Sequence, residues 1–344
     1  MSLYSFQTNF SRTHSQATVH TFRSKFSTSQ TPEKYNSFVI NSNAKVVLEV
    51  KNIQEVGSGT SAKVYASFVK RLPTEYSLDD GEIQILAIKR SKVNDREREI
   101  HSFLTDNHRN ILSLKYHFKF IINNSVAQCL LMELMPESLY GLLQRFRNEH
   151  LPLSSKTKHH FMCSLLSGLS FMHNYRIGHR DIKSHNILVD IDGNLIKIAD
   201  FGCSKVIESG SMNAVHVGSR YYRAPELLCR NINYNLSIDV WSMAIVFMDM
   251  ILFDAIFKGE NENDQLMKIF QILGVPSEEE QKIMNCRIEL GHIETVETKL
   301  HSILGLKEND ELLLLLNKML DYNLNTRISA RDALVYLKEV TIKN

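Results

Sequence analysis

The sequence predicts an α+β protein in which a small β-rich part is followed by a larger helical part. Two observations carry this prediction. Runs of β-branched and other apolar residues with strand-like patterning occur before residue 134. After residue 135, apolar side chains recur at the spacing of a helix, as in the stretch that begins at Thr157. With 43% apolar residues, the chain can bury a sizeable core without disulfide bonds.

Three segments follow from these patterns. Residues 1–46 are mostly rich in Ser, Thr, Asn and Gln and show no sustained period, so we expect a flexible tail. Residues 47–134 form the β-rich lobe and contain one expected helix, from Asp95 to Leu104. Residues 135–340 form the helical lobe, which one β-hairpin interrupts.

The composition argues against several classes of protein. The formal net charge is only +2, so we expect neither nucleic acid nor a membrane surface as a partner. The most apolar stretch begins at Ala244, is short, and contains Asp249 and Asp254, which predicts a buried helix and no membrane span. The five cysteines are scattered and form no C-x-x-C pair, which indicates reduced thiols. We expect a monomer in the cytoplasm, with the nucleus as an alternative.

The hairpin is the most informative local pattern. In "NILVDIDGNLIKIAD", Asp192 and Gly193 form a two-residue turn between alternating strands. Counting back from this turn pairs Asn186 with Ala199, and Asp200 is the next residue. A carboxamide and a carboxylate therefore meet at the open end of the hairpin, as two oxygen ligands of a hard divalent ion would. The plainer alternative is that Asn and Asp simply end the two strands.

The β-rich lobe carries a glycine loop and a strand lysine. Gly57 and Gly59 lie between two strands, where glycines let backbone N–H groups approach a phosphate. Most such G-x-G pairs are plain turns, and a following strand excludes the usual dinucleotide fingerprint. Lys89 lies in an apolar strand and needs an anion if it is buried, and Glu99 on the next helix is the expected partner. A lysine that points to water from an edge strand is the alternative.

The segment "GHRDIKSHNIL" concentrates groups that suit phosphoryl transfer. Asp181 can accept a proton from a hydroxyl, Lys183 can neutralise a phosphate oxygen, and Asn186 can hold a metal. A polar loop can carry the same residue types by chance. The apolar helix before the segment and the hairpin after it make chance a poor explanation.

The order of these motifs resembles a known family. A glycine loop, a strand lysine, a helix glutamate, H-R-D-x-K-x-x-N, D-F-G and A-P-E follow one another as in eukaryotic protein kinases. The resemblance covers about residues 47 to 340. "IDVWS" and "QILGVP" are similar to the branch with cyclin-dependent and mitogen-activated kinases. "MPESLY", "DFGCSK" and "SRYYRAPELL" are most similar to the glycogen synthase kinase 3 group, and the chain is identified as a divergent member.

The resemblance implies a bilobal kinase fold, with ATP and Mg²⁺ as cofactors, that transfers the γ-phosphoryl group to Ser or Thr of protein substrates. Lys89 would bind the ATP phosphates and pair with Glu99. The other residues implied to bind ATP are Val56, Gly57, Ser58, Gly59, Val64, Ala87, Met132, Glu133, Met135 and Leu188.

The same resemblance assigns roles in the helical lobe. Asp181 would orient or deprotonate the substrate hydroxyl, with Lys183 beside the transferring group. Asn186 and Asp200 would hold Mg²⁺. Structural roles are implied for three other residues. Glu226 would pair with Arg327, and Asp239 would brace the catalytic loop, the H-R-D-x-K-x-x-N segment from His179 to Asn186.

A further implication concerns substrate choice. In the resembled group, three basic side chains bind a phosphate already present on the substrate. The matching positions here are Arg98, Arg180 and Lys205, and arginine suits bidentate contact with phosphate. We therefore expect pre-phosphorylated protein substrates, with the target Ser or Thr four residues before a phosphoserine. Without the resemblance, three solvated charges are the simpler interpretation.

The sequence departs from the group in several places. The activation segment, from Asp200 to Glu226, has His216 where the group carries a tyrosine that becomes phosphorylated and meets the arginines matching Arg220 and Arg223. Histidine cannot supply that dianion. The third loop glycine is replaced by Ala62, which predicts weaker ATP binding. The segment around residues 286–297 is unlike the group's scaffold-docking surface, so scaffold docking stays open.

The sequence is compatible with three functions: an active Ser/Thr kinase, a weakly active or inactive kinase-like scaffold, and a nucleic-acid module built on the arginine–tyrosine patch at 220–223. The near-neutral charge argues against the last. The lysine, glutamate, two aspartates and asparagine that the chemistry needs are all present, which favours an active kinase.

Overall fold

We describe the protein from a computed structural model. The described residues are 17–20, 37–42, 46–58, 62–72, 83–122, 125–208, 212–286 and 300–343. The chain divides into two compact units. The first comprises residues 1–107 and 112–135, and the second comprises residues 108–111 and 136–344.

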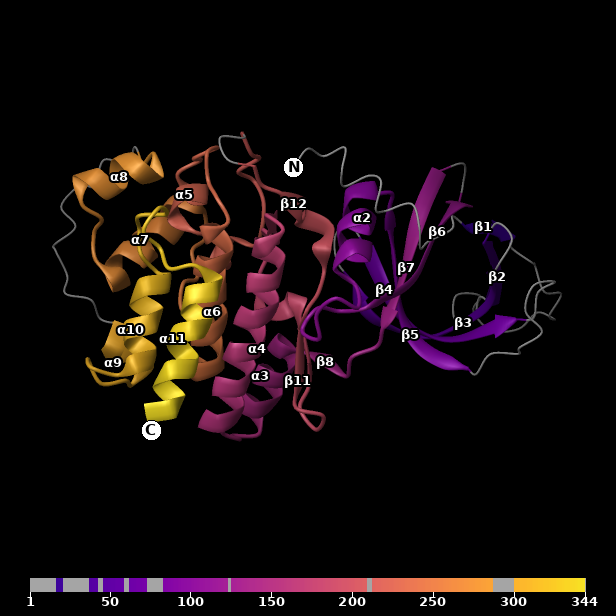
Figure 1. Ribbon diagram of the computed structural model, residues 1–344, viewed down its shortest axis with the longest axis horizontal. Helices are drawn as coiled ribbons and strands as arrows, with labels where there is room; N and C mark the ends of the chain where they lie inside the picture. The colour runs from indigo at the N-terminus through magenta and orange to yellow at the C-terminus, as the bar shows by residue number, and fades with distance from the viewer. Residues whose placement is uncertain are drawn as a thin grey trace. The chain divides into compact units, whose positions relative to one another are not determined.

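The first unit is built on a seven-stranded antiparallel sheet with the order β1-β2-β3-β4-β5-β7-β6 (Figure 1). Its strands are β1 (Ala17–His20), β2 (Ser37–Ser42), β3 (Val46–Ser58), β4 (Ala62–Leu72), β5 (Gln84–Lys92), β6 (Leu114–Ile122) and β7 (Ser125–Glu133). Alternating apolar residues of these strands form its core, in which Val50, Ile88 and Leu131 are fully buried. Burial of such side chains is the main force that holds the sheet together.

Two of these strands correct the prediction of a flexible tail over residues 1–46. β2 pairs with β3 over six residues, and β1 pairs with β2. The segment "SFVINS" at 37–42 contains three consecutive residues with high strand propensity, and polar neighbours obscured that pattern in the sequence. The rest of the expected tail lies outside the described residues, apart from Val46.

Among the described residues of the first unit, helix α2 (Asp95–Leu104) confirms the helix expected there. Its N-cap is Asn94, whose side chain accepts a hydrogen bond from the N–H of Glu97. The residues that it buries are Glu97, Ile100, His101 and Leu104. They lie at the i, i+3, i+4 and i+7 positions of one helix face.

The second unit is mainly helical (Figure 1). Its helices are α3 (Leu139–Asn148), α4 (Ser155–Asn174), α5 (Pro225–Leu228), α6 (Ser237–Leu252), α7 (Glu262–Leu273), α8 (Glu278–Met284), α9 (Leu300–Leu304), α10 (Glu311–Met319) and α11 (Ala330–Lys343). Twelve of the sixteen residues of α6 are buried, as expected for the apolar stretch near Ala244. Among the described residues, no helix is both long and apolar enough to cross a membrane.

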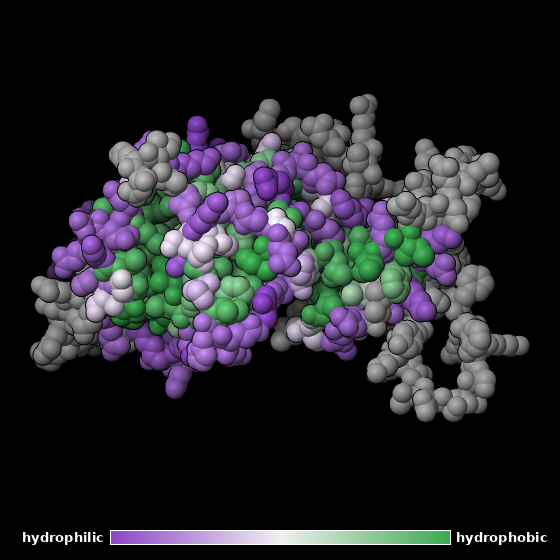
Figure 2. Space-filling model, turned by 90° about the horizontal axis from the view of Figure 1, so that it is seen from below, coloured by the Kyte–Doolittle hydropathy of each residue, from purple (hydrophilic) through white to green (hydrophobic). Residues whose placement is uncertain are grey.

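Short strands in the second unit position its polar loops. They are β8 (Glu137–Ser138), β9 (Ile177–Gly178), β10 (Ile187–Asp190), β11 (Leu195–Ile198) and β12 (Lys205–Val206). Strand β10 pairs with β11 in the expected register, and the N–H of Ala199 donates to the carbonyl of Asn186 at 2.9 Å. Asn194, after the turn, adopts a left-handed φ of 49°. The chain is thus an α+β protein. On the face of the molecule that Figure 2 shows, hydrophilic residues lie beside the apolar areas.

Candidate active site

In the first unit, Lys89 of β5 forms an ion pair with Glu97 of α2. The Lys89 Nζ lies 2.6 Å from the Glu97 Oε1, and the two side chains are 12% and 3% exposed. Glu97 Oε2 also accepts a hydrogen bond from Gln128 of β7 at 3.4 Å, and the other end of that amide accepts from the N–H of Asn94. A buried charge of this kind is stable only when it is paired and hydrogen-bonded.

This pair corrects the prediction that Glu99 is the partner of Lys89. Glu99 is exposed and contacts Arg98 at 3.0 Å. Glu97 shares the buried helix face with Ile100 and Leu104, whereas a residue two positions later lies about 200° further around the helix axis. The apolar period of α2 therefore contained the signal that distinguishes the two glutamates.

The correction also shifts the basic position on α2. The basic residue that directly precedes the paired glutamate is Arg96, whereas the prediction named Arg98, which directly precedes Glu99. Arg96 is exposed. The guanidinium of Arg98 is instead held by Asp95 and Glu99, at 3.3 and 3.0 Å.

We expect Glu97→Gln to lower kcat/KM for ATP by about 10- to 100-fold, the size typical of a lost hydrogen bond to a charged group. The amide keeps the shape of the side chain but removes the charge that holds Lys89. Steady-state kinetics with varied ATP measure the effect. Glu99→Gln is the matched control, and we expect it to stay within about twofold of wild type because Glu99 is exposed. A larger loss for Glu99→Gln than for Glu97→Gln would contradict the assignment.

Other predicted ATP-binding residues of the first unit lie in register on the sheet. Gly57 opposes Val64 across β3 and β4, and Val64 opposes Lys89 across β4 and β5. Ala87 opposes Met132 across β5 and β7, and both are 7% exposed.

The remaining predicted ATP-binding residues differ in their surroundings. The Glu133 carboxylate accepts from the N–H of Ser113 at 2.6 Å. Val56 and Ser58 are exposed, and Met135 is half-buried. Gly59 lies outside the described residues. Leu188 is half-buried in β10 of the second unit.

In the second unit, Asp239 of α6 holds the backbone of the catalytic loop. Its two carboxylate oxygens accept from the N–H groups of His179 and Arg180, both at 2.8 Å. His173 adds a third contact at 3.1 Å. Burial opposes ionisation, but the hydrogen bond from His173 and the nearby histidines hold the pKa of Asp239 below its ordinary value. The predicted bracing role of Asp239 is therefore what the geometry provides, with Arg180 in a left-handed conformation at φ 65°.

Asp181 is surrounded by donors. Its Oδ1 accepts from the N–H and the hydroxyl of Ser219, at 2.8 and 3.0 Å. Its Oδ2 accepts from the amide of Asn186 and from Lys183, both at 2.9 Å. Lys183 also donates to the Ser219 hydroxyl at 2.8 Å. A hydroxyl group is thus held between a carboxylate and an ammonium, which is the environment that a substrate hydroxyl needs before phosphoryl transfer.

Asn186 and Asp200 lie at the open end of the β10–β11 hairpin, as the sequence predicted. The amide nitrogen of Asn186 donates to Asp181, so its oxygen is the atom suited to a metal. Asp200 has a left-handed φ of 62° and accepts from the N–H of Gly202 at 3.3 Å. These oxygen donors fit Mg²⁺, which uses one or two carboxylates together with phosphate oxygens. Within the described residues, no group of three or more His, Cys, Asp or Glu forms a metal site on its own.

The end of the activation segment is fixed by its arginines. Arg220 donates to the carbonyl of Glu260, and Arg223 donates to the carbonyl of Gly218 at 2.9 Å. His216 is 67% exposed and lies 3.5 Å from Glu262 of α7. Sequence reasoning missed Glu262, because no motif marks it.

Arg180 and Lys205 lie close together on the backbone of the second unit. The β9–β12 ladder pairs Gly178 with Lys205, and Arg180 follows Gly178 by two residues. Arg180 donates to the Cys203 carbonyl at 2.7 Å and to the Tyr234 hydroxyl at 3.0 Å. Lys205 donates to Asn213 at 2.8 Å.

Glu226 and Arg327 form the predicted ion pair, and both side chains are fully buried. The contact is bidentate, with N–O distances of 2.6 and 3.0 Å. The Arg327 guanidinium also donates to the carbonyls of Asp321 and Ser237. The pair joins the end of the activation segment to the segment that precedes α11.

A second buried carboxyl, Asp249 of α6, was not predicted to have a role. Its Oδ2 accepts from Ser184 of the catalytic loop at 2.5 Å and from Tyr222 at 2.7 Å. Burial raises the pKa of Asp249 from 3.8 to about 7. The folded state therefore favours the protonated form of Asp249, and protonation of Asp249 stabilises the fold. This stabilisation is fully present below about pH 4 and is lost as the pH rises to 7.

Cys203, after the D-F-G motif, has a pKa raised by burial and by Asp181 and Asp200, which fits an inert thiol.

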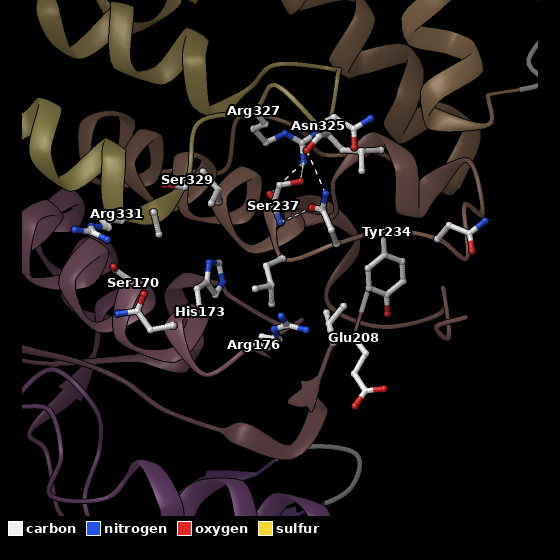
Figure 3. Close-up of a pocket in the computed structure, with 18 residues that line it drawn as sticks. Ser170, His173, Arg176, Glu208, Tyr234, Ser237, Asn325, Arg327, Ser329 and Arg331 are labelled. Carbon is white, nitrogen blue, oxygen red and sulfur yellow. Dashed lines mark hydrogen bonds between the residues drawn. The ribbon is translucent and has the colours of Figure 1, made fainter. Parts of the chain in front are cut away.

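A separate cavity of about 670 Å³ lies in the second unit (Figure 3). The end of α4, the segment before α6 and the start of α11 supply its lining, including His173, Tyr234, Ser237 and Arg331. None of the predicted ATP-binding or catalytic residues lines it, so we assign it no part in the reaction.

Comparisons with known proteins agree with this geometry. A family model described as the protein kinase domain matches residues 50–336. The chain belongs to the protein kinase family. It is 32% identical over 297 residues to the serine/threonine-protein kinase RIM11/MSD1 of Saccharomyces cerevisiae, a match that covers 86% of this chain and 78% of that protein.

It is also 32% identical over 293 residues to protein kinase gsk3 of Schizosaccharomyces pombe, with 84% of this chain and 74% of that protein covered. The chain is therefore a serine/threonine protein kinase of the glycogen synthase kinase 3 group.

Proposed function

We propose that this kinase prefers protein substrates that already carry a phosphate group. The observation that supports the proposal concerns Arg180 and Lys205: Lys205 pairs with Gly178 in the β9–β12 ladder, and Gly178 precedes Arg180 by two residues. Arg180 is 6% exposed, and the described residues contain hydrogen-bond partners for its Nε and Nη1 but none for its Nη2. A guanidinium beside an ammonium matches the charge and the geometry of a phosphate. The resemblance adds a third basic residue, which lies on α2 directly before the glutamate that pairs with Lys89. Because that glutamate is Glu97, the third basic residue is Arg96.

We propose that the residues of the two units divide the chemistry as follows. Members of the protein kinase family use ATP, typically with Mg²⁺, and Lys89, held by Glu97, binds a phosphate of ATP. Asp181 orients the substrate hydroxyl and accepts its proton, and Lys183 neutralises charge on the transferring group. When bound, Mg²⁺ supplies further neutralisation of phosphate charge. Asn186 and Asp200 would hold it by their side-chain oxygens.

The test compares one peptide with and without a phosphoserine four residues after the target serine. We expect wild-type kcat/KM to be at least about tenfold higher for the phosphorylated peptide, because one charge-assisted contact is worth about 1.5–3 kcal/mol. Lys205→Gln should lose most of this preference and keep its rate on the plain peptide. Lys282→Gln, at an exposed lysine of α8, is the control. Equal wild-type rates on the two peptides would overturn the proposal.

A further inference from the structure

Glu262, the first residue of α7, lies among the side chains of two arginines and one histidine. Its Oε1 is 3.1 Å from an Nη of Arg223 and 3.5 Å from the Nδ1 of His216. Its Oε2 is 3.4 Å from an Nη of Arg230. The carboxylate therefore joins α7 to the activation segment and to the turn that follows α5.

The contact with Arg223 is the strongest of the three. The side chain of Arg223 is 16% exposed, whereas those of His216 and Arg230 are 67% and 68% exposed. Exposed ion pairs contribute little, while a largely buried guanidinium needs a partner. The main role of Glu262 is thus to neutralise and orient Arg223.

Arg223 connects Glu262 to the catalytic carboxylate. Its Nε donates to the carbonyl of Gly218 at 2.9 Å. Gly218 has a φ of 78°, and a Cβ there would lie 2.6 Å from the carbonyl oxygen of Arg180. The next residue, Ser219, donates twice to Asp181. A shift of Arg223 would therefore move the peptide that donates to Asp181.

The start of α7 is a firm support for this contact. Asn261 caps the helix by accepting from the N–H of Asp264, and Leu266 and Ile269 are buried. A carboxylate in the first turn of a helix is also favoured by the helix dipole. Glu262 thus extends from a rigid element toward the activation segment.

From these contacts we propose that Glu262 is a positioning residue for phosphoryl transfer. It is a permanent negative charge that holds Arg223, and through Gly218 and Ser219 it keeps the activation segment aligned on Asp181. The alignment needs no phosphate at residue 216. The proposal rests on the kinase activity of the chain and is independent of any preference for phosphorylated substrates.

The kinetic test uses Glu262→Gln, Glu262→Asp and a control, Asp254→Asn. Asp254 also pairs with two cations, Lys258 and Arg147, but no hydrogen bond or ion pair joins it to the described part of the activation segment. We expect Glu262→Gln to lower kcat/KM for a peptide by roughly tenfold, the coupling typical of one ion-pair network. KM for ATP should not change. Glu262→Asp should recover much of the loss, and the control should match wild type.

A double-variant cycle tests the route. If Glu262 acts through Arg223, then Glu262→Gln combined with Arg223→Gln loses no more activity than Arg223→Gln alone. Additive losses would overturn this route. So would wild-type kcat/KM in Glu262→Gln, or equal losses in Glu262→Gln and Asp254→Asn.

Hydrogen exchange gives a readout that does not depend on turnover. The N–H of Ser219 is bonded to Asp181, so its peptide should be protected in wild type. We expect faster exchange over residues 212–223 in Glu262→Gln and not in Asp254→Asn. Unchanged exchange in Glu262→Gln would overturn the proposal. The loss should be equal on plain and phosphorylated peptides, whereas a failure of the substrate preference would appear in the wild-type ratio alone.

Discussion

Replacing Asp181 with Asn is expected to lower kcat for phosphoryl transfer by about 10²- to 10⁴-fold, the usual worth of a positioned general base. The carboxylate accepts from Ser219 on one oxygen and from Asn186 and Lys183 on the other. An amide NH₂ group in the place of Oδ2 would face the donors of Asn186 and Lys183, and it could not accept a proton from the substrate. Both the charge and the hydrogen-bond pattern of the site are therefore lost.

The measurement is the initial rate of phosphate transfer to a serine peptide at saturating ATP. The matched control is Asp192→Asn, at an exposed aspartate in the hairpin turn, which should keep the wild-type rate. Circular dichroism should show that both variants fold. A residual rate above about a tenth of wild type in Asp181→Asn would contradict the role given to this residue.

Replacing Glu226 with Gln should produce the largest loss of stability, about 3–5 kcal/mol in the free energy of unfolding. Arg327 is fully buried, and the substitution leaves its charge without a counterion. Its remaining acceptors, the carbonyls of Asp321 and Ser237, cannot replace a bidentate carboxylate. For a unit of this size we expect the melting temperature to fall by about 10 °C.

Thermal and denaturant unfolding of purified protein measure this effect. Glu278→Gln, at an exposed glutamate in the first turn of α8, should change the free energy of unfolding by about 0.5 kcal/mol or less. Replacing both Glu226 and Arg327 by methionine should restore part of the loss, since no unpaired charge stays buried. A melting temperature of Glu226→Gln within about 2 °C of wild type would show that the pair does not support the fold.

Local patterns in the sequence were sufficient for several parts of the site. The Asp192-Gly193 turn fixes the register of its hairpin, so the meeting of Asn186 with the residue before Asp200 could be counted from it. The helix from Asp95 to Leu104 has the bounds that the sequence predicted. Such features depend on residues that are near in sequence.

One error came from giving a motif more weight than local periodicity. Glu99 was preferred to Glu97 although Ile100 and Leu104 mark the buried face on which Glu97 lies. The same choice made Arg98, and not Arg96, the basic residue directly before the glutamate. The strand at 37–42 was overlooked for a different reason, which is that polar sequence surrounds it.

Contacts between distant segments could not be predicted. Glu262 reaches Arg223 across 39 residues, and Asp249 reaches Ser184 across 65. Neither acidic residue belongs to a motif, and each acquires its role only when α6 and α7 are folded against the activation segment and the catalytic loop.

The most direct test of the central claim is the transfer of phosphate from ATP to a peptide with a target serine four residues before a phosphoserine, by wild type and by Asp200→Ala. Wild type should transfer phosphate in the presence of Mg²⁺. The variant should be slower by at least about 100-fold, because it lacks the only carboxylate of the proposed metal pair. Equal rates for the two proteins, or no transfer above background by wild type, would contradict the account of this chain as a metal-dependent serine/threonine kinase.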